Sequence, residues 1–249
     1  MNRPIEDQPD LLQTRLWSRF RVSLLGPFAL VDGSGAPIAV ANGTQRLLSL
    51  LALRDRVVHR TSVAGALWPD VPESRAHASL RSSLSRIPKP ARSAVNVSDA
   101  EICLADGVGV DLREAQSTAH RLLDETSSLH DGDVSGATLS LLSADLLPGW
   151  NDEWVIPEAE EWRHLRLHAL EALSARLVVH SRFGDAVMAA MAAIKAEPLR
   201  ESAHAALIRA HLAECNQSEA LRQYMRYQEL LHAQLGIAPT SRLRELVGI

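Results

Sequence analysis

The chain has 249 residues, a length that favours two domains of roughly 100–150 residues each. Aromatic residues make up 4% of it while alanine and leucine abound, which favours helices over sheets. Its two cysteines follow no spacing motif and no apolar run approaches the ~18 residues of a membrane helix, so we expect a cytoplasmic protein without disulfides, signal peptide or membrane span.

Charge is divided between the two parts of the chain. Residues 15–92 hold twelve basic and four acidic residues, whereas residues 96–249 hold 13 basic and 23 acidic residues. A cationic N-terminal module predicts a polyanion partner, most often nucleic acid. The acidic C-terminal module would repel that partner, which leaves it free for another role.

The beginning of the cationic module predicts short strands. Residues 1–20 form a polar lead-in, and the β-rich run 21–31 is interrupted by a Gly-Pro pair. A turn at 32–35 then leads to a hairpin partner at 37–40. Strands flanking a group of helices indicate a small β-sheet at this end of the chain.

Three helices follow, each with a Ser or Thr near its expected start, and two further strands at 94–97 and 102–105 come after them. Thr44 is the predicted cap of the first helix, Thr61 or Ser62 that of the second over 63–68. Ser74 is the predicted cap of the third, which covers 74–87 up to a proline at 88.

After residue 110 the pattern is helical throughout. Asp111 and Glu114 have the spacing of a capping box before a helix over 115–123. The Gly-, Ser- and Asp-rich stretch 127–136 predicts a linker, and 146–154 an aromatic-rich turn. Four more helices are predicted over 157–180, 185–196, 200–213 and 218–235.

This second part also contains a repeat. Ala186 and Ala220 lie 34 residues apart, each directly after an acid, and Met191 and Met225 share the same offset. A period of 34 is typical of tetratricopeptide helix pairs. The sequence therefore favours a tetratricopeptide-like helical domain, with a generic helical bundle as the alternative.

The third predicted helix, 74–87, is amphipathic. With Leu80 turned inward, Ala76, Leu84 and Ile87 fall in the same stripe, and His77 lies towards the core side. The opposite face combines small and cationic residues without an acid. It consists of Ala78, Ser82 and Ser85, flanked by Arg75, Ser79, Arg81 and Arg86, with Lys89 just past the end.

Such a face suits the major groove of double-stranded DNA. Small side chains let a helix backbone approach the base edges, arginine pairs with guanine, and serine bonds several bases. An Arg- and Ser-rich face can also be an ordinary solvated surface, and the helix alone does not decide between the two. The cationic module around it favours the DNA-binding interpretation.

Other chemistry has little support in the sequence. His164 and His168 stand four residues apart on one predicted helix, a spacing that could bind a metal, but no third ligand is identifiable. No phosphate-binding loop, zinc-protease motif or nucleophile elbow occurs. We therefore expect neither an enzyme nor a resident cofactor or metal.

Several segments of the sequence resemble those of a known protein family. SLLGPFALVDG, TQRLLSLLAL, TSVAGALWPD and SRAHASLRSSLSRI are similar to the winged-helix half of the Streptomyces antibiotic regulatory protein (SARP) family. LLPGWNDEWV, RLHALEALSARL and the block from EPLRES to SRLREL are similar to its bacterial transcriptional activator domain. The resemblance extends over nearly all of residues 21–247.

The resemblance implies an α+β chain, with an OmpR-type winged helix over 21–110 and an all-α, tetratricopeptide-like activator domain over 111–249. It also implies a transcriptional activator at the nucleoid that binds repeated promoter sites through 74–87 and contacts RNA polymerase. Secondary-metabolite genes would be its targets, and a homodimer could form on the DNA. The alternative is a helical protein-binding scaffold with only a weak, non-specific nucleic-acid-binding patch.

Two features depart from the family pattern. Prolines at 88 and 90 end the recognition helix early, and the expected wing, 96–108, carries Asp99, Glu101 and Asp106 but no Arg or Lys. An OmpR-type wing usually places a basic residue in the minor groove. We therefore expect affinity to depend on the helix and on phosphate contacts from Arg46, Arg60 and Arg92.

Overall fold

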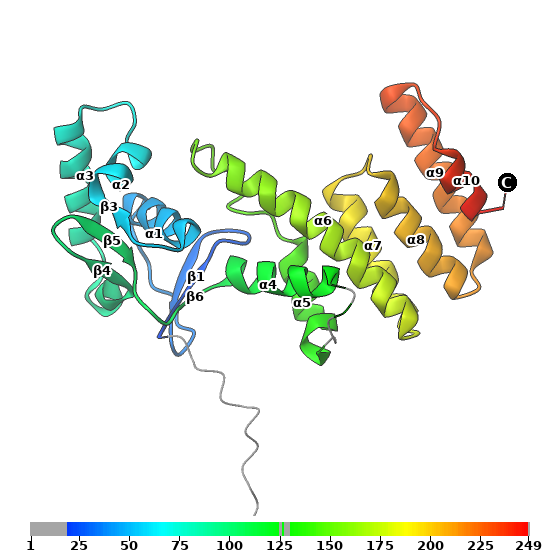
Figure 1. Ribbon diagram of the computed structural model, residues 1–249, viewed down its shortest axis with the longest axis horizontal. Coiled ribbons are helices and arrows are strands. Elements are labelled where there is room, and N and C mark those ends of the chain that lie inside the picture. Colours follow the sequence, from blue (N-terminus) through cyan, green and yellow to red (C-terminus); the bar gives the residue numbers. More distant parts are fainter. Residues whose placement is uncertain (1–18, 125, 127–129, 249) are drawn as a thin grey trace, which may run out of the picture. The chain divides into compact units, whose positions relative to one another are not determined.

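A computed structural model describes residues 19–124, 126 and 130–248 (Figure 1). Their contacts divide them into two compact units. The first contains residues 19–23 and 28–110, and the second contains residues 24–27 and 111–248. The lead-in expected over residues 1–20 lies almost wholly outside the described residues.

The described part of the first unit forms two small sheets and three α-helices (Figure 1). In one sheet β1 pairs antiparallel with β2 and parallel with β6, and in the other β5 pairs antiparallel with β3 and β4. The strands are β1 (Phe20–Ser23), β2 (Ala29–Asp32), β3 (Val58–His59), β4 (Val95–Val97), β5 (Glu101–Leu104) and β6 (Val108–Val110). The helices are α1 (Asn42–Arg54), α2 (Arg60–Leu67), α3 (Glu73–Ser85) and the 3₁₀-helix η1 (Lys89–Ala94).

The order of a small sheet, three helices and a terminal hairpin confirms the predicted fold class for this unit, although several strand details differ. The segment at 37–40 is not a strand. It makes one isolated bridge, Val31 with Pro37, beside a hydrogen bond from the Ile38 N–H to the Leu30 carbonyl at 2.7 Å. The Asp32 N–H donates to the Ala36 carbonyl at 3.0 Å on the other side of this bridge, so Pro37 lies at a non-hydrogen-bonded position where its missing N–H costs nothing. The strands β3 and β6 were not predicted.

The predicted helix caps are wrong. The residues preceding the helices are Ala41, His59 and Pro72, all with extended ψ angles and none with a side-chain capping bond. Thr44, Thr61 and Ser74 instead lie inside the first turns. Thr44 is buried, and its hydroxyl donates to the Ser83 carbonyl at 3.0 Å, which ties α1 to α3. Tertiary packing, rather than capping, explains this threonine.

The described part of the second unit is helical apart from its turns. Its elements are α4 (Asp111–Leu123), η2 (Asp131–Val134), α5 (Gly136–Ser143), α6 (Ile156–Val179), α7 (Phe183–Ala196), α8 (Glu201–Ala213), α9 (Gln217–Leu235) and α10 (Ser241–Leu246). The four long helices agree with the predicted ranges to within two residues, whereas α5 and α10 were not predicted. Part of the predicted linker at 127–136 folds as η2, and residues 127–129 lie outside the described part.

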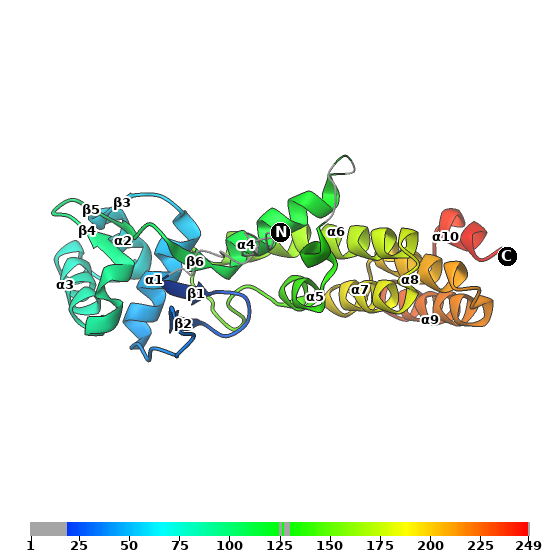
Figure 2. The same cartoon turned by 90° about the horizontal axis from the view of Figure 1, so that it is seen from below.

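Helices α6 to α9 pack in chain order, each against the next. Figure 2 shows α6 and α8 in one layer and α7 and α9 in the other. This alternation is the arrangement of tetratricopeptide-like helix pairs. Ala186 and Ala220, the two positions related by the period of 34, are both buried in it, and Met191 and Met225 are both half exposed.

The turns that join these helices repeat with the same period. Ser181 and Cys215 both have left-handed backbones, with φ of 58° and 66°. The N–H groups of Ser181 and Arg182 donate to the carbonyls of Val178 and Leu177, at 2.9 Å in each case. The corresponding donors 34 residues later, Cys215 and Asn216, bond Leu212 and His211 at 3.0 and 2.8 Å. The repeat is therefore present in the backbone as well as in the sequence.

Residues 24–27 belong to the second unit although strands of the first unit precede and follow them. The Asp111 carboxylate accepts hydrogen bonds from the N–H groups of Leu24 and Leu25, at 2.8 and 3.2 Å. The Gly26 N–H donates to the Asp145 carbonyl at 2.8 Å. The Gly-Pro interruption of the β-rich run is thus a segment fixed by the helical unit.

Candidate nucleic-acid interface

The sequence places α3 with one side in the core of the first unit, and the structure agrees. Ala76, Leu80 and Ile87 are buried, and Leu84 is half-buried. The helix ends at Ser85 rather than Ile87, because Arg86 already serves as its C-cap. Ser83 is also buried, where its carbonyl accepts the Thr44 hydroxyl. This stripe fixes which face of α3 is left outside.

The predicted small-and-cationic face of α3 is accessible to solvent. Ser79 and Ser82 are half-buried, and the remaining residues of the face are exposed. The side chains of Arg75, Arg81 and Arg86 form no hydrogen bond or ion pair with any described residue. The exposed members are Arg75, Ala78, Arg81, Ser85 and Arg86, followed in η1 by Lys89.

One acid, Glu73, lies in the first turn of α3 but not on this face. It stands seven residues before Leu80, so the helical period places it on the side of the buried stripe. There its carboxylate lies 3.5 Å from the Nε2 of His77. The carboxylate of Glu73 therefore does not lie among the arginines of the cationic face.

The three arginines expected to contact phosphate each bond a backbone carbonyl of the first unit. Arg46 Nη2 donates to the Leu67 carbonyl at 2.7 Å, at the end of α2. Arg92 Nε lies 3.4 Å from the Ile87 carbonyl, just beyond α3. Both contacts hold the guanidinium group close to a helix end, so each side chain is more constrained than a solvated surface arginine.

Arg60 lies at the turn between β4 and β5. Its N–H donates to the Ala100 carbonyl at 2.8 Å, and its Nη1 donates to the Ser98 carbonyl at 3.2 Å. The sequence suggested a wing without a basic residue, because no Arg or Lys lies in 96–108. The structure supplies one from the start of α2, through the pairing of β3 with β5. No local signal in the sequence could reveal this contact.

The acidic residues of the expected wing are also separated. Asp99 and Glu101 lie at the β4–β5 turn, whereas Asp106 lies in the turn that joins β5 to β6. The strand β5 runs between these two turns, and a strand rises about 3.3 Å per residue. Only Asp99 and Glu101 therefore share the turn with Arg60.

The two histidines at 164 and 168 have different neighbours. His164 Nε2 lies 3.0 Å from Glu160, while His168 Nδ1 lies 3.1 Å from Arg200 Nη2, so the two rings have different partners. Among the described residues, no group of three or more His, Cys, Asp or Glu side chains is arranged to hold a metal. In the part of the chain that the structure describes, each helix is too short or too polar to span a lipid bilayer.

Comparison with known proteins identifies the C-terminal part. Residues 99–248 match the family model of the bacterial transcriptional activator domain. The chain is 32% identical over 239 residues to the regulatory protein AfsR of Streptomyces coelicolor, covering 91% of this chain and 24% of AfsR. It is 26% identical over 258 residues to the transcriptional regulatory protein EmbR of Mycobacterium tuberculosis, covering 92% and 62%.

A solved structure has the same fold. Mycobacterium tuberculosis EmbR in complex with a low-affinity phosphopeptide superposes with a TM-score of 0.66 at 24% identity, over 92% of this chain and 64% of that one. The chain thus spans about a quarter of AfsR and less than two thirds of EmbR. The likeness confirms a winged helix followed by a helical domain.

Proposed function

The chain belongs to the bacterial transcriptional activator domain family, among regulators of the SARP type, and we propose that it activates transcription by binding specific DNA sequences. Members of this family are transcriptional regulators and not enzymes. In this proposal residues 21–110 form the DNA-binding domain and residues 111–249 the activator domain. The helix α3 enters the major groove.

The observation that carries the proposal is the exposed face of α3. A helix of 13 residues is about 20 Å long, and the major groove is about 12 Å wide, enough to admit one helix. Ala78, Ser82 and Ser85 bring the backbone close to the base edges. Arg81 and Arg86 flank them with guanidinium groups that have no partner in the described part of the chain, and these groups suit the two acceptors of guanine.

Phosphate contacts complete the proposed interface. Arg46 in α1 and Arg92 in η1 each contact a backbone carbonyl at or just beyond the end of a neighbouring helix, which holds their positive charges on the first unit. Arg60 gives the β4–β5 turn a positive charge, which supports a role of this turn at the DNA backbone despite Asp99 and Glu101. Contacts of this kind orient a protein on DNA without reading sequence.

We further propose that two protomers bind tandem promoter repeats, since a single winged helix contacts few base pairs. Half-sites would be spaced by one helical turn or a multiple of it. The second unit would contact RNA polymerase, and secondary-metabolite genes would be the targets. This division of roles agrees with the opposite charges of the two modules.

The test is a selection of bound sites from a random duplex library, followed by titration of the selected site at several salt concentrations. We expect the logarithm of the binding constant to fall with the logarithm of the salt concentration, with a slope near −0.9 per neutralised phosphate. We also expect the chain to prefer the selected site clearly over bulk competitor DNA. Arg81→Ala and Arg86→Ala should each lower affinity by roughly 1–3 kcal/mol and relax one base position. Arg46→Ala should weaken all sequences about equally.

Arg226→Ala is the matched control, since Arg226 is an exposed arginine of the second unit whose side chain has no partner among the described residues. It should bind the selected site like the original chain. A flat salt dependence without site preference would favour the protein-binding scaffold instead. If both α3 variants bind like the original chain, α3 is not the recognition helix.

A further inference from the structure

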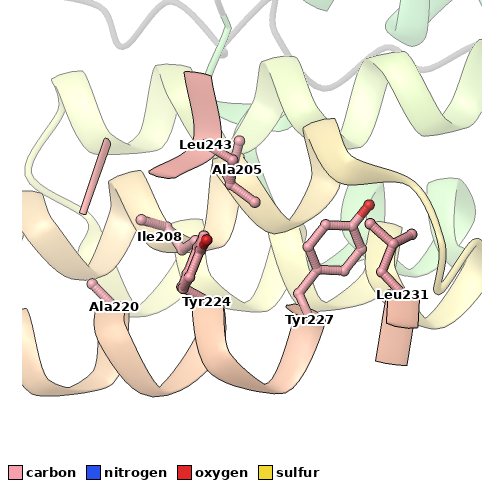
Figure 3. Close-up of a cluster of buried hydrophobic side chains, with 7 residues drawn as sticks. All are labelled: Ala205, Ile208, Ala220, Tyr224, Tyr227, Leu231 and Leu243. Carbon is pink, nitrogen blue, oxygen red and sulfur yellow. The ribbon is translucent and has the colours of Figure 1, made fainter. Parts of the chain in front are cut away.

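An open cavity of about 310 Å³ lies between α8 and α10 in the second unit. Its floor is apolar and consists of Ala205 from α8 with Leu243 and Leu246 from α10. Figure 3 shows Leu243 beside Ala205, at the edge of the buried cluster that includes Tyr224 and Tyr227. The volume lies at the lower end of the range for small-molecule sites, which is about 300–1,000 Å³.

Two arginines line this cavity. Arg209 extends from α8 and Arg242 from α10, and both are exposed. Within the described chain, neither side chain forms a hydrogen bond or an ion pair. Arg226 and Arg244 are likewise exposed and have no side-chain partner in the ranges that the structure describes, but they do not line the cavity.

The carboxylate that lines the cavity, that of Glu201, is already engaged. It accepts hydrogen bonds from the backbone N–H of Thr240, at 3.0 Å, and from the Thr240 hydroxyl. Thr240 is the N-cap of α10, and its hydroxyl oxygen accepts from the Leu243 N–H. Glu201 therefore holds α10 in place and leaves the rim with a net positive charge.

We propose that this cavity binds a small organic anion. An apolar group of one or two rings would cover Ala205, Leu243 and Leu246, while a carboxylate or phosphate would lie between Arg209 and Arg242. Both anions match the planar donor geometry of guanidinium groups. The proposal concerns the helical unit alone and does not depend on DNA binding by α3.

The experiment is an NMR titration of the full chain, labelled at its leucine methyl groups, in the absence of DNA. The probes are naphthalene-2-carboxylate, 2-naphthyl phosphate and the neutral naphthalene-2-carboxamide. At least one anion should shift the Leu243 and Leu246 methyl signals saturably, and the carboxamide should bind at least about tenfold more weakly. The tighter of the two anions identifies the preferred headgroup.

Variants then separate the cavity from general charge attraction. Arg209→Ala and Arg242→Ala should each weaken the anion about tenfold or more, the loss of a charge-assisted hydrogen bond. Arg244→Ala, on the same short helix, and Arg226→Ala, on α9, should leave the affinity unchanged. An unaltered Leu243 signal in each free variant shows that α10 is in place.

Three results would overturn the proposal. The first is that neither anion shifts the methyl signals of Leu243 and Leu246 saturably. The second is that the carboxamide binds as tightly as the carboxylate. The third is that Arg244→Ala weakens binding as much as Arg242→Ala, which would mean that the anion senses only the charge of the surface. A failure of α3 to bind DNA would leave all of these outcomes unaffected.

Discussion

The arginines of α3 and six arginines of the helical unit have opposite surroundings. On α3, Arg75, Arg81 and Arg86 stand beside small side chains and have no partner among the described residues. In the helical unit the side chains of many arginines hold carboxylates. The pairs are Arg121–Asp133, Arg163–Glu160 and Arg163–Glu197, Arg166–Asp145, Arg182–Asp185, Arg200–Glu171 and Arg222–Glu219.

One residue type thus serves two purposes in this chain. A pair such as Arg200–Glu171 joins α8 to α6, and its charge is neutralised within the fold. The α3 arginines contribute no such link, so they add little to stability and remain available to a polyanion. A change to a paired arginine of the helical unit should therefore alter stability, whereas a change on α3 should alter DNA affinity.

The largest effect on stability is expected at Arg166 and Asp145. The Arg166 side chain is only 4% exposed, while its partner Asp145 is 66% exposed. Burial, together with the nearby charge of Arg163, lowers the pKa of Arg166 even though Asp145 favours its charged form. Asp145→Ala leaves this buried charge without its partner, and we expect a loss of roughly 3 kcal/mol in the free energy of unfolding by urea.

Two controls make this test specific. Arg166→Met keeps the apolar volume and removes the charge, so it should cost clearly less than Asp145→Ala. Arg81→Ala on α3 should change the free energy of unfolding by less than about 0.5 kcal/mol. If Arg81→Ala and Asp145→Ala lowered the free energy of unfolding equally, the difference between the α3 arginines and the paired arginines of the helical unit would be contradicted.

The next effect concerns the close approach of α3 to DNA. Ala78 is exposed in the middle of the cationic face, and Ala78→Glu adds both bulk and a negative charge there. We expect a loss of about 2 kcal/mol or more in DNA affinity, measured by gel-shift titration, with little change in stability. Glu219→Gln, a charge change on the surface of α9, is a control that should bind DNA like the original chain.

A third prediction concerns pH and the helical unit alone. His204 is buried and stacks on Tyr227 with a ring distance of 4.0 Å. Its Nε2 lies 2.8 Å from the Pro198 carbonyl, and its Nδ1 lies 2.7 Å from the Gln223 amide nitrogen, which together suit the neutral ring with its proton on Nε2. Desolvation lowers the pKa of His204, more than the Pro198 carbonyl and the charge of Glu201 raise it.

The sign of the effect follows from this lowered pKa. The unfolded chain takes up a proton below its ordinary pKa of about 6.5, where the folded chain still resists it, so stability falls as the pH drops from 6.5. The loss is at most about 1.4 kcal/mol per pH unit. Urea unfolding at pH 7 and pH 5.5 measures it, and His204→Gln should flatten the difference. The lowered pKa of His204 would be contradicted if the free energy of unfolding rose towards pH 5.5 in the original chain but not in His204→Gln.

The exposed face of α3 could be predicted because it depends on local periodicity. Leu80 and its neighbours at helical spacing define the buried stripe, and the residues on the opposite side of α3 are therefore the exposed ones. The long helices of the second unit and their period of 34 were accessible for the same reason. Signals of this kind need only residues within one or two turns of each other.

The features that the sequence did not reveal join residues far apart in the chain. Arg60 reaches the β4–β5 turn at Ser98, and β6 pairs with β1 from the other end of the unit. The six-residue helix α10 is too short to show a strong pattern of its own. Its start is fixed by Glu201 through Thr240, which lies 39 residues later in the chain. The capping errors have the same origin, because packing decided where Thr44 lies.

The smallest predicted effect tests the repeat of the helical unit. Ser181 and Cys215 occupy left-handed positions in equivalent turns, and residues with a side chain pay a cost there that glycine avoids. Ser181→Gly and Cys215→Gly should therefore each raise the free energy of unfolding by about 0.5 kcal/mol, after the larger entropy of glycine in the unfolded chain is subtracted. Thermal and urea unfolding of both variants give the comparison. Because the backbone bonds of the two turns match, the two gains should be nearly equal. Changes of opposite sign would show that the turns are not energetically equivalent, and that the period of 34 describes geometry only.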